Sequence, residues 1–219
     1  MTVKFYGHPF SSFCQKVLIA LYENATPFEW RTLSPEHPQN GAQFAALWPF
    51  KRFPLLIDGE RVVTESTIII EYLGLYHPGP VQLVPDDPRV ALEVRHMERI
   101  FDNYVSIPVQ KIVFDSMRPS DERDERGVAE AHAMLDNAYG WLERALAERE
   151  WAAADRFSVA DCAAAPALFY ADWVHRIDAG LPHLSAYRQR LLARPSFARA
   201  VDEARPFRSF FPPGAPDRD

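Results

Sequence analysis

Cysteine is scarce in this chain: only Cys14 and Cys162 occur among 219 residues. Two cysteines so far apart do not suggest a disulfide framework, and their number fits a reducing cytoplasm. Long hydrophobic runs are also missing, since no window reaches the roughly 18 apolar residues of a membrane-spanning helix. Lys4 and His8 interrupt the apolar residues at the N-terminus, so we expect no signal peptide. The sequence therefore predicts a cytoplasmic protein with no membrane partner.

Positive charge is in deficit, because the formal net charge is −6. This balance gives no support to a nucleic-acid-binding role. No glycine-rich phosphate loop occurs among the nine glycines. The seven histidines are scattered, and no pair has metal-ligand spacing with a third ligand nearby, so we expect no metal site. What is present is an ordinary globular composition, long enough for one large domain or two smaller ones.

The most informative stretch is residues 53–66. Two short strand candidates flank the turn dipeptide Asp58-Gly59, and a buried helix follows. Pro54 is tolerated at the first strand residue, and a cis Phe53-Pro54 bond would leave the backbone of Phe53 free to pair with an extended peptide. The N-terminus of the helix after Glu65 can seat a carboxylate. An unpaired extended backbone beside an anion-binding helix N-terminus predicts a binding site for a small peptide with a free carboxylate.

The first third of the chain alternates strands and helices. We expect strands at 2–6 and 28–33, a helix at 13–23, a loop at 34–40, irregular helical turns at 41–48, the hairpin, and a helix to about 76. A strand–helix–strand unit crosses over right-handedly to a parallel neighbour, and the hairpin adds antiparallel strands. The order predicts an α/β first domain, residues 1–78, with a mixed four-stranded sheet of thioredoxin-like type.

Beyond a proline-rich linker at residues 79–88 the strand pattern vanishes. Apolar residues recur at helical spacing as far as Met117, with Pro108 as a candidate kink. Ser158 and Asp161 form a capping-box pattern at the start of a very apolar helix. Further helices are expected at 120–149, 158–174, 181–193 and 195–204. Residues 89–219 are therefore predicted to form an all-α helical bundle that ends in an extended tail at 206–219.

The stretch at 53–66 resembles the glutathione site of the cytosolic glutathione S-transferase family. The family carries a valine- or phenylalanine-proline-x-leucine segment, a short hairpin, and a glutamate- or glutamine-serine pair at the next helix start. In this sequence these motifs are Phe53-Pro54-Leu55-Leu56 and Glu65-Ser66. The resemblance covers almost the whole chain. It implies the same two-domain fold, glutathione as co-substrate, and a homodimer.

The resemblance also implies which residues bind glutathione. Phe53, whose backbone conformation depends on Pro54, would pair through its backbone with the cysteinyl unit. Glu65 and Ser66 would bind the γ-glutamyl end. Candidates for the glycyl carboxylate are Arg52, Lys51, His37 and Gln39.

Glutathione chemistry needs a thiolate, because a thiol with a pKa near ~8.5 is mostly protonated at neutral pH. A hydroxyl that donates to the sulfur lowers that pKa, as does a helix N-terminus aimed at it. By resemblance to serine-type classes, such as theta, zeta and related bacterial ones, Ser11 holds the catalytic position. Adjacent Ser12, Tyr6 at the strand end, and Cys14 are rivals. Each rival also has a plain structural role, as a helix cap or as core.

The second substrate is expected between the domains, against an aromatic wall that the tail partly covers. The candidate wall residues are Phe10, Phe13, Phe101, Tyr104 and Phe210.

These features predict a transferase in which Ser11 stabilises the thiolate for attack on a small hydrophobic electrophile. The reaction type stays open, since conjugation, dehalogenation, isomerisation and peroxide reduction all use this thiolate. The alternatives are a Cys14-dependent glutathione thiol–disulfide oxidoreductase and a non-catalytic binding or scaffold protein. For the dimer, Trp48-Pro49-Phe50 and the helix from Arg89 are interface candidates.

Overall fold

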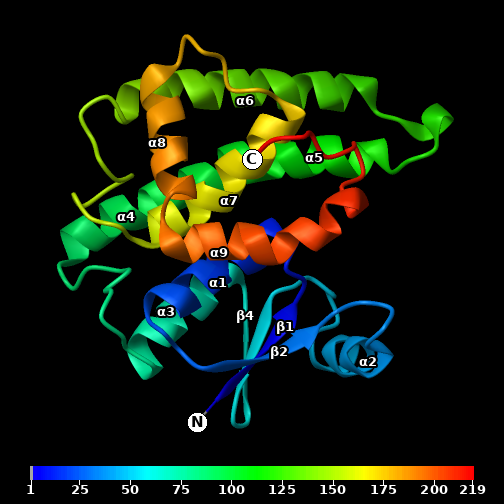
Figure 1. Ribbon diagram of the computed structural model, residues 1–219, viewed down its shortest axis with the longest axis vertical. Helices are drawn as coiled ribbons and strands as arrows, with labels where there is room; N and C mark the ends of the chain where they lie inside the picture. Colours follow the sequence, from blue (N-terminus) through cyan, green and yellow to red (C-terminus); the bar gives the residue numbers. More distant parts are fainter. Residues whose placement is uncertain (1) are drawn as a thin grey trace.

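The computed structural model describes residues 2–219, and a four-stranded sheet forms one side of the molecule (Figure 1). The strand order is β2-β1-β3-β4. β1 pairs in parallel with β2, and β3 pairs antiparallel with both β1 and β4. The strands are β1 (Val3–Gly7), β2 (Phe28–Thr32), β3 (Leu55–Asp58) and β4 (Arg61–Thr64). This mixed sheet confirms the predicted thioredoxin-like first domain.

Three helices cover the sheet, namely α1 (Ser12–Glu23), α2 (Pro38–Leu47) and α3 (Ser66–Tyr76). α1 and α3 pack together and lie between the sheet and the helical domain, as Figure 1 shows. α2 contributes Phe44 to a separate small core with Tyr6 and Leu55.

The predicted loop at 34–40 ends three residues early, and the turns predicted at 41–48 belong to one regular helix, because α2 begins at Pro38. Proline suits the first position of a helix, where its missing N–H would have no partner anyway. The side chain of Asn40 also donates to the carbonyl of Thr32 at 3.0 Å, which ties this helix to β2. The proline that suggested a loop is therefore the residue that starts the helix.

Residues 77–87 contain no helix or strand, and the helical domain follows them. Its elements are α4 (Pro88–Ile100), a π-helical segment (Phe101–Ser106), α5 (Ile107–Ser116), a 3₁₀ turn (Ser120–Glu122), α6 (Glu125–Ala145), α7 (Val159–Val174), α8 (Pro182–Leu192) and α9 (Pro195–Ala204). The predicted helix at 120–149 begins later than expected, where the Asp124 side chain accepts from the N–H of Gly127 at 2.9 Å. No helix within residues 2–219 combines the length and apolar character needed to cross a membrane.

The helix that was expected to kink at Pro108 instead contains a π-helical segment of several residues. The segment lies directly before Pro108, and α5 continues beyond. Proline has no N–H to donate to the preceding turn, and a π turn accommodates that missing bond.

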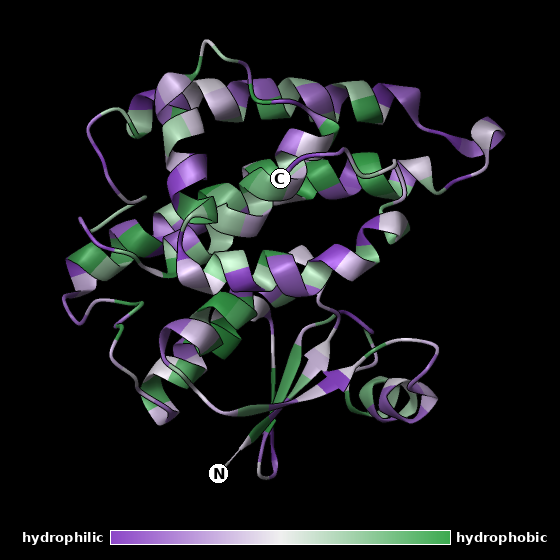
Figure 2. Cartoon of the chain, viewed as in Figure 1, coloured by the Kyte–Doolittle hydropathy of each residue, from purple (hydrophilic) through white to green (hydrophobic). Residues whose placement is uncertain are grey.

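α7 is the centre of the second core. It packs against α1, α4, α5 and α8, and almost all of its residues are buried. Figure 2 shows mostly hydrophobic residues along α7 and α1, and hydrophilic segments along α6 at the periphery. The capping box at the start of α7 is confirmed, with Ser158 and Asp161 fully buried.

A buried ion cluster joins the two domains. Lys16 of α1 is 1% exposed, and its ammonium donates to the Thr67 hydroxyl at 3.0 Å and to the Asp102 carboxylate at 2.8 Å. It also pairs with the carboxylate of Glu98. A buried ammonium is tolerated when oxygens surround it in this way. The cluster therefore fixes α1 and α3 against α4.

The predicted extended tail at 206–219 is wrong for its first residues, whereas residues 211–219 contain no helix or strand. Residues Arg205–Phe210 form a 3₁₀ helix, and Phe211 after it is buried. Asp219 pairs with the guanidinium groups of Arg205 and Arg208, while Arg218 donates to the Asp172 carbonyl at 2.7 Å. An apolar anchor and arginine–carboxylate pairs hold this segment against α7, and proline content alone did not reveal them.

Candidate active site

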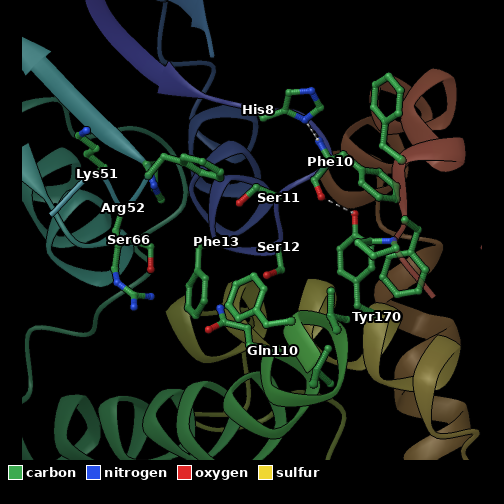
Figure 3. A pocket seen from close by; sticks show the side chains of 18 of the residues that line it. His8, Phe10, Ser11, Ser12, Phe13, Lys51, Arg52, Ser66, Gln110 and Tyr170 are labelled. Carbon is green, nitrogen blue, oxygen red and sulfur yellow. Dashed lines mark hydrogen bonds between the residues drawn. The ribbon is translucent and has the colours of Figure 1, made fainter. Parts of the chain in front are cut away.

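A cavity of about 880 Å³ lies between the two domains. The first domain lines it with the β1–α1 loop, the start of α1, residues 50–54 and the start of α3. The second domain lines it with α5, one residue of α7 and the tail. Figure 3 shows Ser11, Ser12 and Phe13 on one side of the cavity and Gln110 of α5 on the opposite side. The cavity has a polar end near α3 and an apolar end near the tail.

Ser11 stands at the N-terminus of α1. Its N–H donates to the carbonyl of His8 at 3.0 Å, and its hydroxyl oxygen accepts from the N–H of Cys14 at 3.4 Å. A hydroxyl that accepts one hydrogen bond still has its own proton to donate. Ser11 can therefore cap the helix and donate to a sulfur in the cavity at the same time. Ser12 also lines the cavity, as the first residue of α1.

The rivals Tyr6 and Cys14 do not line the cavity. The Tyr6 hydroxyl donates to the Gln43 side chain at 2.9 Å, and the Tyr6 ring packs in the small core with Phe44. Cys14 is fully buried, and burial raises the pKa of its thiol to about 11. Because the thiolate is the reactive form, Cys14 is inert at neutral pH. This geometry does not favour the oxidoreductase alternative.

The Phe53-Pro54 peptide bond is cis, which is the condition stated above for an accessible Phe53 backbone. Phe53 and Pro54 both line the cavity, with Pro54 buried and Phe53 41% exposed. Among residues 2–219, no group forms a hydrogen bond with the backbone of Phe53. The backbone of Phe53 is thus available to an extended peptide lying along the cavity.

Glu65 and Ser66 form the start of α3 at the polar end of the cavity. Glu65 has φ of 66°, a left-handed conformation that a residue with a side chain adopts at a cost of about 1–3 kcal/mol. Ser66 is only 6% exposed and lines the cavity, where its hydroxyl can donate to a ligand. The first N–H groups of a helix lack partners inside the helix. This combination of free donors and local strain is typical of a ligand-binding site.

Basic residues border the same end of the cavity. Lys51 and Arg52 line it, and both are exposed. Lys51, like Glu65, has a positive φ, of 51°. Gln39 and His37 do not line the cavity, since Gln39 is an exposed residue of α2 and His37 precedes that helix. The contact of Gln39 or His37 with the glycyl carboxylate stays a prediction, without support from the lining of the cavity.

The apolar wall combines predicted and unexpected residues. Phe10, Phe13 and Phe210 lie on it, but Phe101 and Tyr104 do not. The predictions for those two residues are wrong: Phe101 is fully buried with its ring 6.3 Å from that of Tyr187, and Tyr104 is 49% exposed outside the cavity. Both residues belong to the π-helical segment, and the next element, α5, supplies the wall instead. Its wall residues are Val109, Gln110, Val113 and Phe114, followed by Met117.

His8 lines the cavity and had no sequence signal beyond its closeness to Ser11. Burial lowers the pKa of its ring, against an opposing effect of Glu36. Its Nδ1 accepts from the N–H of Phe10 at 3.1 Å, so the neutral ring carries its proton on Nε2. Tyr170 of α7 is a second lining residue that the sequence did not reveal.

The tail covers the apolar end through Phe211. The Phe211 ring lies 6.2 Å from that of Phe10, 6.1 Å from that of Tyr170 and 5.1 Å from that of Trp173. Phe210 and Pro212 line the cavity beside it.

Replacing Phe211 by alanine is expected to weaken binding of an apolar electrophile. Burying a phenylalanine ring stabilises by about 1.5–3 kcal/mol, so we expect the KM for an aryl electrophile to rise about tenfold. The KM for glutathione should not change. Tyr104→Ala is the matched control, because it removes an exposed aromatic ring outside the cavity. Equal KM values for Phe211→Ala and Tyr104→Ala would exclude a role for the tail in substrate binding.

Within residues 2–219, no group of three or more histidine, cysteine, aspartate or glutamate side chains is arranged to hold a metal ion.

Two family models match this chain, one in each of its two domains. Residues 5–81 match the family model described as glutathione S-transferase, N-terminal domain, and residues 107–195 match glutathione S-transferase, C-terminal domain. A glutathione S-transferase of Silene vulgaris is 30% identical over 214 residues, covering 92% of this chain and 97% of that protein. The glutathione S-transferase GstB of Escherichia coli K12 is 28% identical over 203 residues, covering 91% and 97%.

Solved structures of glutathione S-transferases are also similar to this chain. A glutathione S-transferase of Methylobacterium radiotolerans, in complex with glutathione sulfonate, has a TM-score of 0.80 at 30% identity and covers 92% of this chain and 95% of its own. A glutathione S-transferase of Methylobacillus flagellatus with glutathione bound has a TM-score of 0.81 at 23% identity, covers 91% and 98%, and shows the fold alone. Because both family models match, and a relative 30% identical aligns over nearly its whole length, the chain belongs to the glutathione S-transferase family.

Proposed function

We propose that this protein is a serine-type glutathione transferase, in which Ser11 stabilises the glutathione thiolate for attack on a small hydrophobic electrophile. One observation carries the proposal: the hydroxyl at the start of α1, the Phe53-Pro54 edge and the start of α3 all line one cavity. The relative from Methylobacterium radiotolerans, crystallised with glutathione sulfonate, supports glutathione as the co-substrate.

Glutathione would lie extended along the polar end of the cavity. The backbone of Phe53 pairs with the cysteinyl unit, because an unpaired extended backbone recognises another. At the γ-glutamyl end, the Glu65 carboxylate accepts from the ammonium, and the Ser66 hydroxyl and N–H donate to the carboxylate. Lys51 and Arg52 are the positive charges available for the glycyl carboxylate.

The cysteinyl sulfur then faces Ser11 and the N-terminus of α1. Lowering the thiol pKa by two units requires about 2.7 kcal/mol of preference for the thiolate. One hydrogen bond to the charged sulfur and a helix dipole together supply this amount. The thiolate attacks the electrophile at the apolar end, where a new carbon–sulfur bond forms. The scaffold alternative is disfavoured, since it has no use for a strained Glu65 beside a Ser66 that lines the cavity.

Ser66→Ala is expected to weaken glutathione binding about tenfold, since loss of one hydrogen bond to a charged group removes about 1.4 kcal/mol or more. Isothermal titration calorimetry with glutathione measures this change. Ser120→Ala is the control, because it removes an exposed serine that does not line the cavity. Unchanged affinity in Ser66→Ala would place the γ-glutamyl end elsewhere.

Exposed apolar side chains support the proposal of a homodimer. Ile68 and Leu75 lie seven residues apart on α3 and are 54% and 77% exposed, while Leu92 of α4 is 68% exposed and Phe50 is 71% exposed. Exposed apolar side chains that gather in one region mark interaction surfaces. Light scattering after size-exclusion chromatography tests the dimer. We also propose a cytoplasmic location, which two free, buried cysteines fit.

A further inference from the structure

Two side chains from different domains hold the loop that precedes Ser11. The Gln15 amide of α1 donates to the carbonyl of Pro9 at 3.0 Å and to the Tyr170 hydroxyl at 3.2 Å. Tyr170 of α7 donates its hydroxyl to the carbonyl of Phe10 at 3.2 Å, the bond drawn in Figure 3. The hydrogen bonds form one chain, from α1 through α7 to the residue directly before Ser11.

Chemistry fixes the direction of every bond in this chain. The carbonyl of Pro9 can only accept, so Gln15 must turn its NH₂ group toward it. The second amide hydrogen then reaches the Tyr170 oxygen, and Tyr170 gives its own proton to the carbonyl of Phe10. Burial raises the pKa of Tyr170, so it keeps this proton at any pH at which the protein works. In this series of hydrogen bonds, the donors therefore always point from Gln15 and Tyr170 toward the carbonyls of the loop.

Stability alone does not account for Gln15. The side chain is fully buried, and its Oε1 has no hydrogen-bond partner within residues 2–219. A buried amide with an unpaired oxygen is unfavourable, and an apolar side chain of similar length would avoid that cost. Its helix neighbours Val17 and Leu18 are fully buried core residues, so an apolar side chain would suit the position. What Gln15 contributes is its pair of hydrogen bonds to the loop.

The loop is held at each of its three carbonyls. The carbonyl of His8 accepts from the N–H of Ser11 at 3.0 Å, that of Pro9 from Gln15, and that of Phe10 from Tyr170. Rotation of the peptide units before Ser11 would redirect its hydroxyl. A hydrogen bond weakens steeply with misalignment, so small rotations would reduce stabilisation of the thiolate.

We propose that Gln15 and Tyr170 are positioning residues for Ser11, which hold the carbonyls of Pro9 and Phe10 so that the Ser11 hydroxyl points at the glutathione sulfur. The inference rests on the proposed function. The ring of Tyr170 also lines the cavity and stacks on Phe211. Tyr170 therefore links the apolar wall that would bind the electrophile to Ser11, the proposed hydrogen-bond donor to the glutathione sulfur.

Tyr170→Phe keeps the ring and removes only the hydroxyl, and Gln15→Met keeps the length and removes the amide. In either variant we expect the pKa of enzyme-bound glutathione to rise by about one unit, and kcat/KM at pH 7 to fall about threefold. The Kd for glutathione should stay within about twofold, because the proposed glutathione contacts involve neither residue. Ultraviolet absorbance of the thiolate against pH measures the pKa, and calorimetry measures Kd.

Tyr139→Phe is the matched control. Its buried hydroxyl also donates to a backbone carbonyl, that of His175 at 2.9 Å, away from the loop. We expect it to lower the unfolding midpoint about as much as Tyr170→Phe without moving the thiol pKa. The double variant Gln15→Met, Tyr170→Phe should lose little more than Tyr170→Phe alone, since the two groups act in one chain.

An unchanged thiol pKa in both Gln15→Met and Tyr170→Phe would overturn the inference, and so would an equal shift in Tyr139→Phe. If Tyr170→Phe does not fold, Gln15→Met alone decides. A wild-type protein that conjugates glutathione, with variants that behave like it, refutes the positioning role only. A wild-type protein that does not bind glutathione refutes the proposed function as well.

Discussion

Replacing Ser11 by alanine is expected to raise the pKa of bound glutathione by about one to two units, and to slow conjugation at pH 7 by about 3- to 25-fold. The variant loses the hydroxyl that would donate to the sulfur, while the dipole of α1 remains. The sign follows from the chemistry: a higher thiol pKa means less thiolate at pH 7, so the loss should shrink as the pH is raised. A pH profile of kcat/KM shows this directly.

Ser11 also caps α1, and an alanine cap costs about 1 kcal/mol of stability. Ser11→Gly separates the two roles, because glycine at this position costs only a few tenths of a kcal/mol and still lacks the hydroxyl. Ser12→Ala is the companion variant, since both serines line the cavity. Full activity in Ser11→Ala and Ser11→Gly, with loss in Ser12→Ala, would transfer the donor role to Ser12.

Replacing Asp161 by alanine is expected to have the largest effect on stability. Its buried carboxylate accepts from the N–H and hydroxyl of Ser158 at 2.9 and 3.0 Å, the N–H of Ala152 at 2.9 Å and the Tyr187 hydroxyl at 2.7 Å. Alanine would leave these donors buried and unpaired. Removing one partner from such a network costs about 3–5 kcal/mol of unfolding free energy.

Chemical denaturation measures that loss as a lower midpoint. Asp121→Ala is the control, because Asp121 is exposed on the turn before α6 and should change stability by less than about 0.5 kcal/mol. An unchanged midpoint in Asp161→Ala would mean that α7 does not depend on its cap.

Most of the fold could be predicted from local sequence patterns. The Asp58-Gly59 hairpin, the alternation of strands and helices, and the Ser158 and Asp161 cap depend on near neighbours, so the sequence shows them. The errors lie where distant contacts decide. The bonds of Arg218 to Asp172 of α7, for example, join residues that are 46 positions apart in the sequence.

The same distinction applies to the candidate site. Ser11, Phe53 and Ser66 belong to short motifs and line the cavity as the sequence suggested. Phe101 and Tyr104 had the right helical spacing, but Phe101 packs in the core and Tyr104 is exposed outside the cavity. Tyr170 lies 160 residues from Phe10 in the chain, and no local pattern predicts a hydrogen bond between them.

The most direct test is a crystal structure after soaking with glutathione. We predict a tripeptide extended beside Pro54, with its γ-glutamyl carboxylate at Ser66 and its sulfur within hydrogen-bond distance of the Ser11 hydroxyl. A sulfur directed away from Ser11, or a cavity without bound tripeptide at saturating glutathione, would contradict the proposed function.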